Sequence, residues 1–201
     1  MSGFDFITQS NSCVQRKECR ILSEQIKIEI NTCIACNQAC LDHTFVGKMT
    51  TCLVNPRACY ETELQYLPAK TRKKIAIVGA GPAGLSVASV AALRGHDVTL
   101  YEAKGDVGGQ LNYAKKVPGK EEFHETLRYY KKQLALHNVK LMLNHKVTEK
   151  ELIDSGFDEI VVASGVLPRD LDIPGIDHPK VVGYQNVFLG ASIGKNVAVI
   201  G

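Results

Sequence analysis

Short hydrophobic runs alternate with segments of helical periodicity over most of the chain beyond residue 70. Aliphatic residues dominate the runs, as in strands of a parallel sheet that are buried on both faces. The expected strands cover residues 75–78, 98–101, 139–143 with a continuation over 144–147, and 157–163. The expected helices cover the alanine-rich residues 85–94 and the amphipathic residues 123–136. This alternation predicts an α/β fold, a parallel sheet with flanking helices.

The first expected strand runs into a glycine-rich turn, Gly79-Ala80-Gly81-Pro82-Ala83-Gly84. In a nucleotide-binding turn, Gly79 would permit the tight bend, Gly81 would let backbone approach a pyrophosphate, and Gly84 would let the helix pack close to the strand. The phosphates would then lie at the helix N-terminus. Glu102 follows the second strand, where a carboxylate accepts a hydrogen bond from a ribose 2′-hydroxyl and repels a 2′-phosphate. The pattern predicts a site for FAD or NAD rather than NADP; the alternative is a turn that only packs strand on helix.

Two more glycine-containing segments come after expected strands, Gly108-Gly109-Gln110 and Ala163-Ser164-Gly165. Ligands of open α/β sheets bind beyond the carboxyl ends of the strands. The second segment is therefore expected at the same rim as the glycine-rich turn. The first would allow backbone to approach a cofactor closely, or would be a plain flexible turn.

Four cysteines ahead of the sheet form the pattern C-x2-C-x3-C-x11-C, at Cys33, Cys36, Cys40 and Cys52. Each iron of a 4Fe-4S cluster takes one thiolate, and this compact spacing is suited to presenting four of them. Structural zinc also accepts four thiolates but usually takes them from two short knuckles, and disulfides or free thiols are further alternatives. Three other cysteines receive no role: Cys13, Cys19 and Cys59.

Composition narrows the range of partners. The chain has 201 residues, 45% of them hydrophobic, and a formal net charge of +3, which is too small to indicate nucleic-acid or membrane partners. Residues 1–30 hold no apolar run long enough for a signal peptide or a membrane span. A cytoplasmic, reducing compartment is therefore expected, and it disfavours disulfides.

Several motifs occur together in order. They are the cysteine stretch 33–40, Cys52-Leu53-Val54-Asn55-Pro56-Arg57, residues 78–84, Gly108-Gly109-Gln110, and Val117-Pro118-Gly119-Lys120-Glu121-Glu122-Phe123. Over residues 29–201 the chain closely resembles the iron–sulfur flavoprotein family of bacterial-type NADPH-dependent 2,4-dienoyl-CoA reductase, trimethylamine dehydrogenase and old yellow enzyme-like ene-reductases.

The resemblance implies an electron relay from NADPH through FAD and a 4Fe-4S cluster to FMN and an enoyl substrate. It implies cluster ligation by Cys33, Cys36, Cys40 and Cys52. It implies an FAD site formed by Gly79, Gly81, Pro82, Ala83, Gly84, Glu102, Gly109, Gln110, Val147, Ser164 and Gly165. No catalytic residue is implied within this chain.

The chain also departs from the family, in which an N-terminal (β/α)8 barrel of roughly 200 residues or more carries FMN and the acyl-CoA site. We expect that barrel and most of the NADPH domain to be missing here, and a barrel-containing polypeptide is a candidate partner. The expected division is an unassigned segment 1–28, a small irregular iron–sulfur module 29–67, an incomplete Rossmann-like FAD domain 72–195, and the first strand of an NAD(P)H domain, 196–201. Residues 26–30 alternate as a short strand would.

The expected function is therefore the electron-transfer part of a 2,4-dienoyl-CoA reductase-like oxidoreductase, a part that would be inactive alone. A stand-alone, non-catalytic electron-transfer module is an alternative. A protein like the small subunit of glutamate synthase, which also places cysteines ahead of a G-x-G-x-x-G turn, is another.

Overall fold

The computed structural model describes residues 29–169 and 171–200, and it contains one four-stranded parallel sheet. The strands are β1 (Lys74–Val78), β2 (Asp97–Tyr101), β3 (Lys140–Met142) and β4 (Glu159–Val162), in the order β3-β2-β1-β4. The helices are α3 (Leu41–Phe45), α4 (Pro82–Leu93), α5 (Leu111–Ala114), α6 (Phe123–Leu136), α7 (Glu149–Asp154) and α8 (Tyr184–Phe188). The predicted α/β fold is confirmed.

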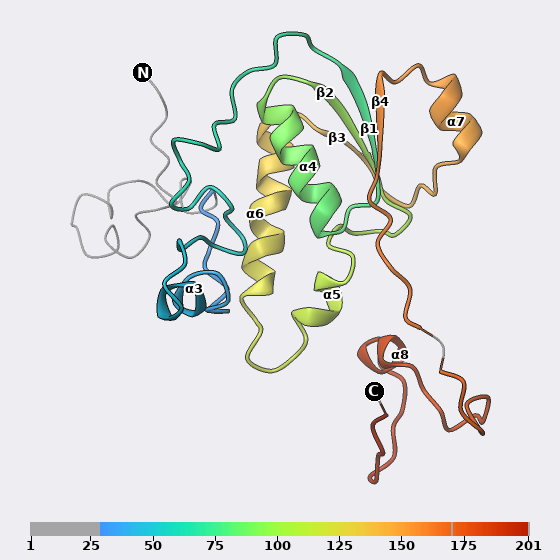
Figure 1. Cartoon of the computed structure of the whole chain (residues 1–201). Helices are drawn as coiled ribbons and strands as arrows, with labels where there is room; N and C mark the ends of the chain where they lie inside the picture. The colour runs from blue at the N-terminus through green and yellow to red at the C-terminus, as the bar shows by residue number, and fades with distance from the viewer. Residues whose placement is uncertain (1–28, 170, 201) are drawn as a thin grey trace.

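The core lies where α4 and α6 pack on one face of the sheet (Figure 1). Strand β1 is buried over its three central residues because β2 and β4 flank it in parallel. Alanine at the helix positions that meet the sheet lets α4 lie close to it, and Ala88 is fully buried there. Leu127 and Leu134 of α6 complete the same core. The amphipathic pattern therefore identified the buried face of α6 correctly.

Some expected strands are shorter in the structure. The continuation of the third strand over residues 144–147 is wrong, because Asn144 has a φ of +54° and donates its N–H to the Lys104 carbonyl oxygen, which turns the chain away from the sheet. No strand forms at Asn196–Ile200, where the described residues provide no neighbouring strand with which to pair. The expected strand over 26–30 lies mostly outside the described residues, and residues 29 and 30 form a turn.

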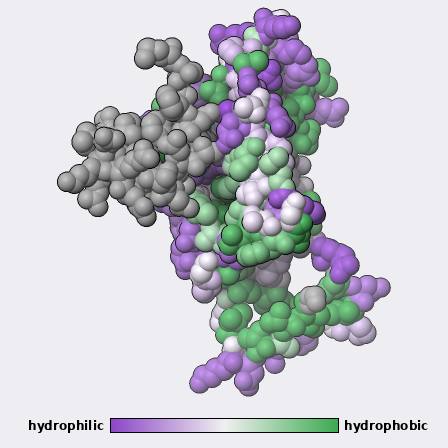
Figure 2. Space-filling model, turned by 60° about the vertical axis from the view of Figure 1, so that its left-hand side comes forward, coloured by the Kyte–Doolittle hydropathy of each residue, from purple (hydrophilic) through white to green (hydrophobic). Residues whose placement is uncertain are grey.

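Residues 29–67 form an irregular segment beside α6 (Figure 1), in which α3 is the only helix among the described residues. At the other end, the chain after β4 extends away from the sheet and carries α8. Hydrophobic side chains gather on this extension, in the lower part of Figure 2. Several are almost fully exposed, such as Leu167 at 90% and Val199 at 91%. Among the described residues, none of the helices has the length and hydropathy of a membrane-spanning segment.

We predict that Gly84→Ala destabilises the fold strongly. A Cβ at this position would overlap the carbonyl oxygen of Gly79, a backbone atom that cannot rotate away. The loss should approach about 3 kcal/mol, the upper end of the usual cost of overpacking. Urea unfolding followed by circular dichroism measures it.

Gly81→Ala is the matched control, because a Cβ there meets no atom within 4 Å. Loss of the N-cap glycine and the lower entropy of the unfolded alanine chain act in opposite directions, so the change should stay within about 1 kcal/mol. Equal unfolding free energies for the two variants would contradict the steric account.

Candidate functional site

The glycine-rich turn joins β1 to α4, and its three glycines have different surroundings. Gly79 has a φ of +103°, and a Cβ there would lie 2.5 Å from the carbonyl oxygen of Ala163, just beyond β4. Gly84 is in contact with the Gly79 backbone. Gly81 instead caps the N-terminus of α4 and faces open space, followed by Pro82 at the first helical position. Packing thus requires Gly79 and Gly84, whereas Gly81 leaves exposed backbone at a helix N-terminus.

Glu102 follows β2 and lies against this turn. Its Oε2 accepts a hydrogen bond from the N–H of Ala80 at 2.8 Å, and its Oε1 accepts one from the N–H of Lys104 at 2.9 Å. Each oxygen of an ionised carboxylate has two acceptor positions, so one position on each oxygen remains for a further donor. The side chain therefore both holds the turn and can accept a hydrogen bond from a sugar hydroxyl.

The second glycine segment is bound to the first. The N–H of Gly108 donates to the carbonyl oxygen of Ala80 at 2.7 Å. Gly109 has a φ of +51°, and a Cβ there would lie 3.0 Å from the Cα of Gly81. The Gln110 side chain donates to the carbonyl oxygen of Val166, beyond β4, at 3.3 Å. These contacts hold Gly108-Gly109-Gln110 against the glycine-rich turn and the residues after β4. The expected close approach of its backbone to a cofactor stays a prediction.

Two polar side chains that sequence reasoning missed hold this segment. Asp106 accepts from the N–H of Val107 at 2.8 Å and pairs with Lys131 of α6 at 2.7 Å. Asn112 donates to the carbonyl oxygen of Val107 at 2.9 Å. An aspartate two residues before Gly108-Gly109 is a turn signal that could have identified the first of these.

The hydrogen bond from Lys131, reinforced by the Val107 N–H, holds the pKa of Asp106 below its ordinary value of 3.8. A carboxyl with a lowered folded-state pKa contributes stability that is complete above the unfolded-state pKa and is lost as the pH falls through the folded-state value. The support that Asp106 gives to this segment is therefore present at neutral pH and lost only in acid below about pH 3.8.

The remaining predicted cofactor residues lie after β3 and β4. Ser164 follows Ala163 and approaches Gly79, with its Cα 3.1 Å from the position of an added Cβ. Gly165 has a φ of +79° and faces open space. Val147 is half-buried in the loop after β3, two residues beyond His145, whose N–H donates to the carbonyl oxygen of Glu102.

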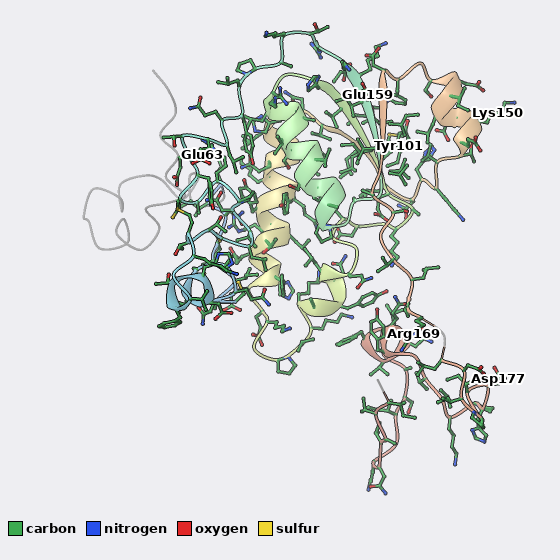
Figure 3. The ribbon with its side chains drawn as sticks, viewed as in Figure 1. Glu63, Tyr101, Lys150, Glu159, Arg169 and Asp177 are labelled. Atoms are coloured by element: carbon green, nitrogen blue, oxygen red, sulfur yellow. The ribbon has the colours of Figure 1, made fainter. Side chains whose placement is uncertain are left out.

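The rim as a whole lies at the carboxyl ends of the strands. In Figure 3, Tyr101 lies at the carboxyl end of β2 and Glu159 at the start of β4, at the opposite end of the sheet. Burial raises the pKa of Tyr101, whose ring lies 5.3 Å from that of His145 and 6.4 Å from that of Phe157. His145 belongs to the loop after β3 and donates its backbone N–H to the carbonyl oxygen of Glu102, so these ring contacts support that loop. Open space at Gly81, a helix N-terminus and an available carboxylate at Glu102 fit a dinucleotide with a free 2′-hydroxyl.

The four patterned cysteines lie on one loop that is tied at its ends. The Asn31 side chain donates to the carbonyl oxygen of Val54 at 2.7 Å, which brings together residues two positions outside Cys33 and Cys52. Within the loop, the N–H of Thr51 donates to the carbonyl oxygen of Ala39 at 2.8 Å, so the residues before Cys52 and Cys40 are neighbours. All four thiols are free and at least partly accessible.

The backbone around the first cysteines is unusual. Ala35 and Asn37, on either side of Cys36, have φ values of +52° and +58°. For alanine this conformation costs on the order of 1–2 kcal/mol. It directs the Ala35 N–H to the Cys33 sulfur at 3.4 Å. Hydrogen bonds of this kind to ligand sulfurs are among the features that set the reduction potential of an iron–sulfur cluster.

Among the described residues, no three His, Cys, Asp or Glu side chains converge closely enough to hold one metal ion. A zinc ion with bonds of about 2.3 Å to four sulfurs requires such convergence. A 4Fe-4S cluster distributes its thiolates over four irons and requires less. The donor set and the tied loop fit a cluster, and ligation by Cys33, Cys36, Cys40 and Cys52 stays a prediction.

A cavity of about 250 Å³ lies where this segment meets α4 and α6. It is lined by Asn31, Tyr66, Ser86, Tyr130 and His137, among others. Burial lowers the pKa of His137 and raises that of Tyr130. The neutral forms of both side chains are therefore favoured at this junction.

Known proteins match both parts of the chain. The metal reductase of Desulforamulus reducens is 38% identical over an alignment of 178 residues, and the match covers 86% of this chain and 27% of that protein. The cinnamate reductase of Clostridium sporogenes is 33% identical over 86% of this chain and 26% of its own length. The structure of a 2-naphthoyl-CoA reductase in complex with 2-naphthoyl-CoA is 38% identical, with a TM-score of 0.79, over 83% of this chain and 26% of that chain.

This chain thus spans about a quarter of the length of these relatives. The family model of the pyridine nucleotide-disulphide oxidoreductases matches residues 73–201, which comprise the sheet, the glycine-rich turn and the C-terminal extension. Since this match covers well over half of the sequence, the chain belongs to the pyridine nucleotide-disulphide oxidoreductase family.

Proposed function

We propose that the chain is the electron-transfer part of an iron–sulfur flavoprotein oxidoreductase, binding FAD at the rim of the sheet and a 4Fe-4S cluster in the cysteine loop. The observation that carries the proposal is the position of α6, which contacts both the Gly108 turn, through Leu127, and the residues that precede Cys33, through Arg128. When bound, FAD accepts a hydride from a nicotinamide and releases electrons one at a time, which a cluster can carry.

The chain's own residues would bind and orient the flavin. The first turn of α4 would present N–H groups to a pyrophosphate beside Gly81, which has no side chain to obstruct it. Glu102 would accept the ribose hydroxyl while it keeps its bonds to Ala80 and Lys104. Gly109, Gln110, Ser164 and Gly165 would border the remainder of the cofactor, and Val147 would lie on the loop beside Glu102.

We further propose that the electrons leave toward FMN and a conjugated acyl substrate, as in the 2,4-dienoyl-CoA reductase type, in a barrel-containing part or partner. Cinnamate and 2-naphthoyl-CoA, named for two of the relatives, are conjugated acyl compounds and support this substrate class. NADPH would serve as the electron source at a site separate from Glu102, since a carboxylate repels a 2′-phosphate.

The flavin site is tested by Gly81→Ala. A methyl group in the open space beside the helix N-terminus would occupy the place of the pyrophosphate, so FAD affinity should fall at least tenfold, about 1.4 kcal/mol. Gly183→Ala is the control, because Gly183 also caps a helix, has a φ of −64° and faces open space, but lies on the extension after β4. Quenching of flavin fluorescence on titration measures both. Unchanged affinity in Gly81→Ala would place FAD elsewhere.

The cluster is tested by iron and sulfide analysis of anaerobically reconstituted protein. Wild-type chain should hold about four irons and four sulfides. Cys40→Ser should lose most of them, while Cys59→Ser, which alters an exposed cysteine outside the pattern, should keep them. One tightly bound zinc, or equal iron contents in the two variants, would contradict the assignment.

A further inference from the structure

Helix α6 joins the two proposed sites through adjacent residues. Leu127 faces the rim, with its Cδ2 2.7 Å from where a Cβ on Gly108 would lie. Arg128, the next residue, reaches the segment that leads into the cysteine loop, residues 29–32, which we call the lead-in segment. One turn further along α6, Lys132 lies 3.8 Å from Glu29 in the same segment. One helix therefore contacts both the Gly108-Gly109-Gln110 turn and the start of the cysteine loop.

Arg128 makes several directed contacts. Its Nη2 donates to the carbonyl oxygen of Ile30 at 2.9 Å and to the hydroxyl oxygen of Thr32 at 3.3 Å. Its Nε donates to Glu125 at 2.6 Å, one turn earlier on the helix. The guanidinium is thus bound to both neighbours of Asn31, and Thr32 immediately precedes Cys33.

Asn31 extends this hold to the far end of the loop. Its side chain is buried, with 8% of the residue exposed, and donates to Val54. The loop from 31 to 54 contains all four patterned cysteines. Arg128 ties the first end of that loop to α6, and the bond between Asn31 and Val54 ties the second end to the first. Displacement of the guanidinium would therefore loosen the hold of α6 on the loop.

The charge of Arg128 has a second consequence. A guanidinium is protonated at every accessible pH, and its side chain is 28% exposed, so solvent screens it less than a surface cation. Reduction of an iron–sulfur cluster adds one negative charge, and nearby positive charge and hydrogen bonds favour the reduced state. Glu125, 46% exposed, opposes this effect in part.

Resting on the function proposed above, we propose that Arg128 is a positioning residue that fixes the lead-in segment against α6 and raises the reduction potential of the cluster in the adjacent loop. Lys131 on the same helix provides the contrast. It pairs with Asp106 beside the Gly108-Gly109-Gln110 turn rather than with the lead-in segment, and both side chains are about half exposed.

The test uses the full chain, reconstituted anaerobically, with the midpoint potential of the cluster measured by titration under electron paramagnetic resonance. Arg128→Gln should lower the potential by about 59 mV, a tenfold change in the ratio of oxidised to reduced cluster for one electron. Glu125→Gln should raise it. Lys131→Gln, which removes a charge of the same sign from the same helix, should leave it unchanged.

Hydrogen exchange of the backbone amides in the lead-in segment distinguishes the positioning role of Arg128 from the effect of its charge on the reduction potential. Arg128→Lys keeps the charge but loses the planar fork, so amides 29–32 should exchange faster, at least tenfold, with little change in potential. Equal potentials in Arg128→Gln, Glu125→Gln and wild type, or unchanged exchange in both Arg128 variants, would overturn the proposal.

A different experimental result would show that the proposed function is wrong. If wild-type protein holds no iron and sulfide, the cluster assignment fails, and the claim about the potential fails with it. Exchange in the metal-free chain then still decides whether Arg128 positions the segment. Should Arg128→Gln not fold by circular dichroism, the Glu125→Gln potential and the Arg128→Lys exchange decide the two parts.

Discussion

The site depends on a steric constraint at the crossing between β1 and α4. Gly84 lies against the carbonyl group of Gly79, and Gly79 in turn lies against Ala163 at the end of β4. Side chains at these two positions would separate the helix from the sheet, and close packing in a protein core leaves no room for that. The N-terminus of α4 therefore meets the ends of β1 and β4 at one point. The open backbone at Gly81 is a consequence of this contact.

Hydrogen bonds then bring the end of β2 to the same point. Glu102 binds the N–H of Ala80 through its side chain and the N–H of His145 through its carbonyl oxygen, while its own N–H donates to Met142. One residue thus connects the glycine-rich turn with the loop after β3. A carboxylate in this position satisfies backbone donors that the turn would otherwise leave without partners. Its capacity for a further donor follows from the number of its lone pairs, since a carboxylate oxygen is not limited to one bond.

Hydrophobic periodicity predicted a helix or strand well where one face of that element is buried in the core. Residues 123–136 coincide with α6 because their apolar spacing matches the face that meets the core. Helix α4 starts at Pro82, earlier than expected, since proline is well suited to the first helical position. The expected continuation of the third strand failed at Asn144, which tolerates a left-handed φ and turns the chain. Sequence spacing likewise identified the glycines of the rim.

Local sequence patterns could not predict contacts between residues that are far apart in the sequence. Arg128 and Ile30 are 98 positions apart, and the periodicity of α6 gives an arginine on its polar face no specific partner. The cysteine spacing likewise predicts which residues would be ligands, but it does not predict the contacts that hold their loop in place. A segment of about forty residues with one five-residue helix buries little apolar surface of its own. Its order therefore has to come from contacts outside the loop, such as those of α6 with residues 29–32, because the loop has no core sufficient to fix its cysteines.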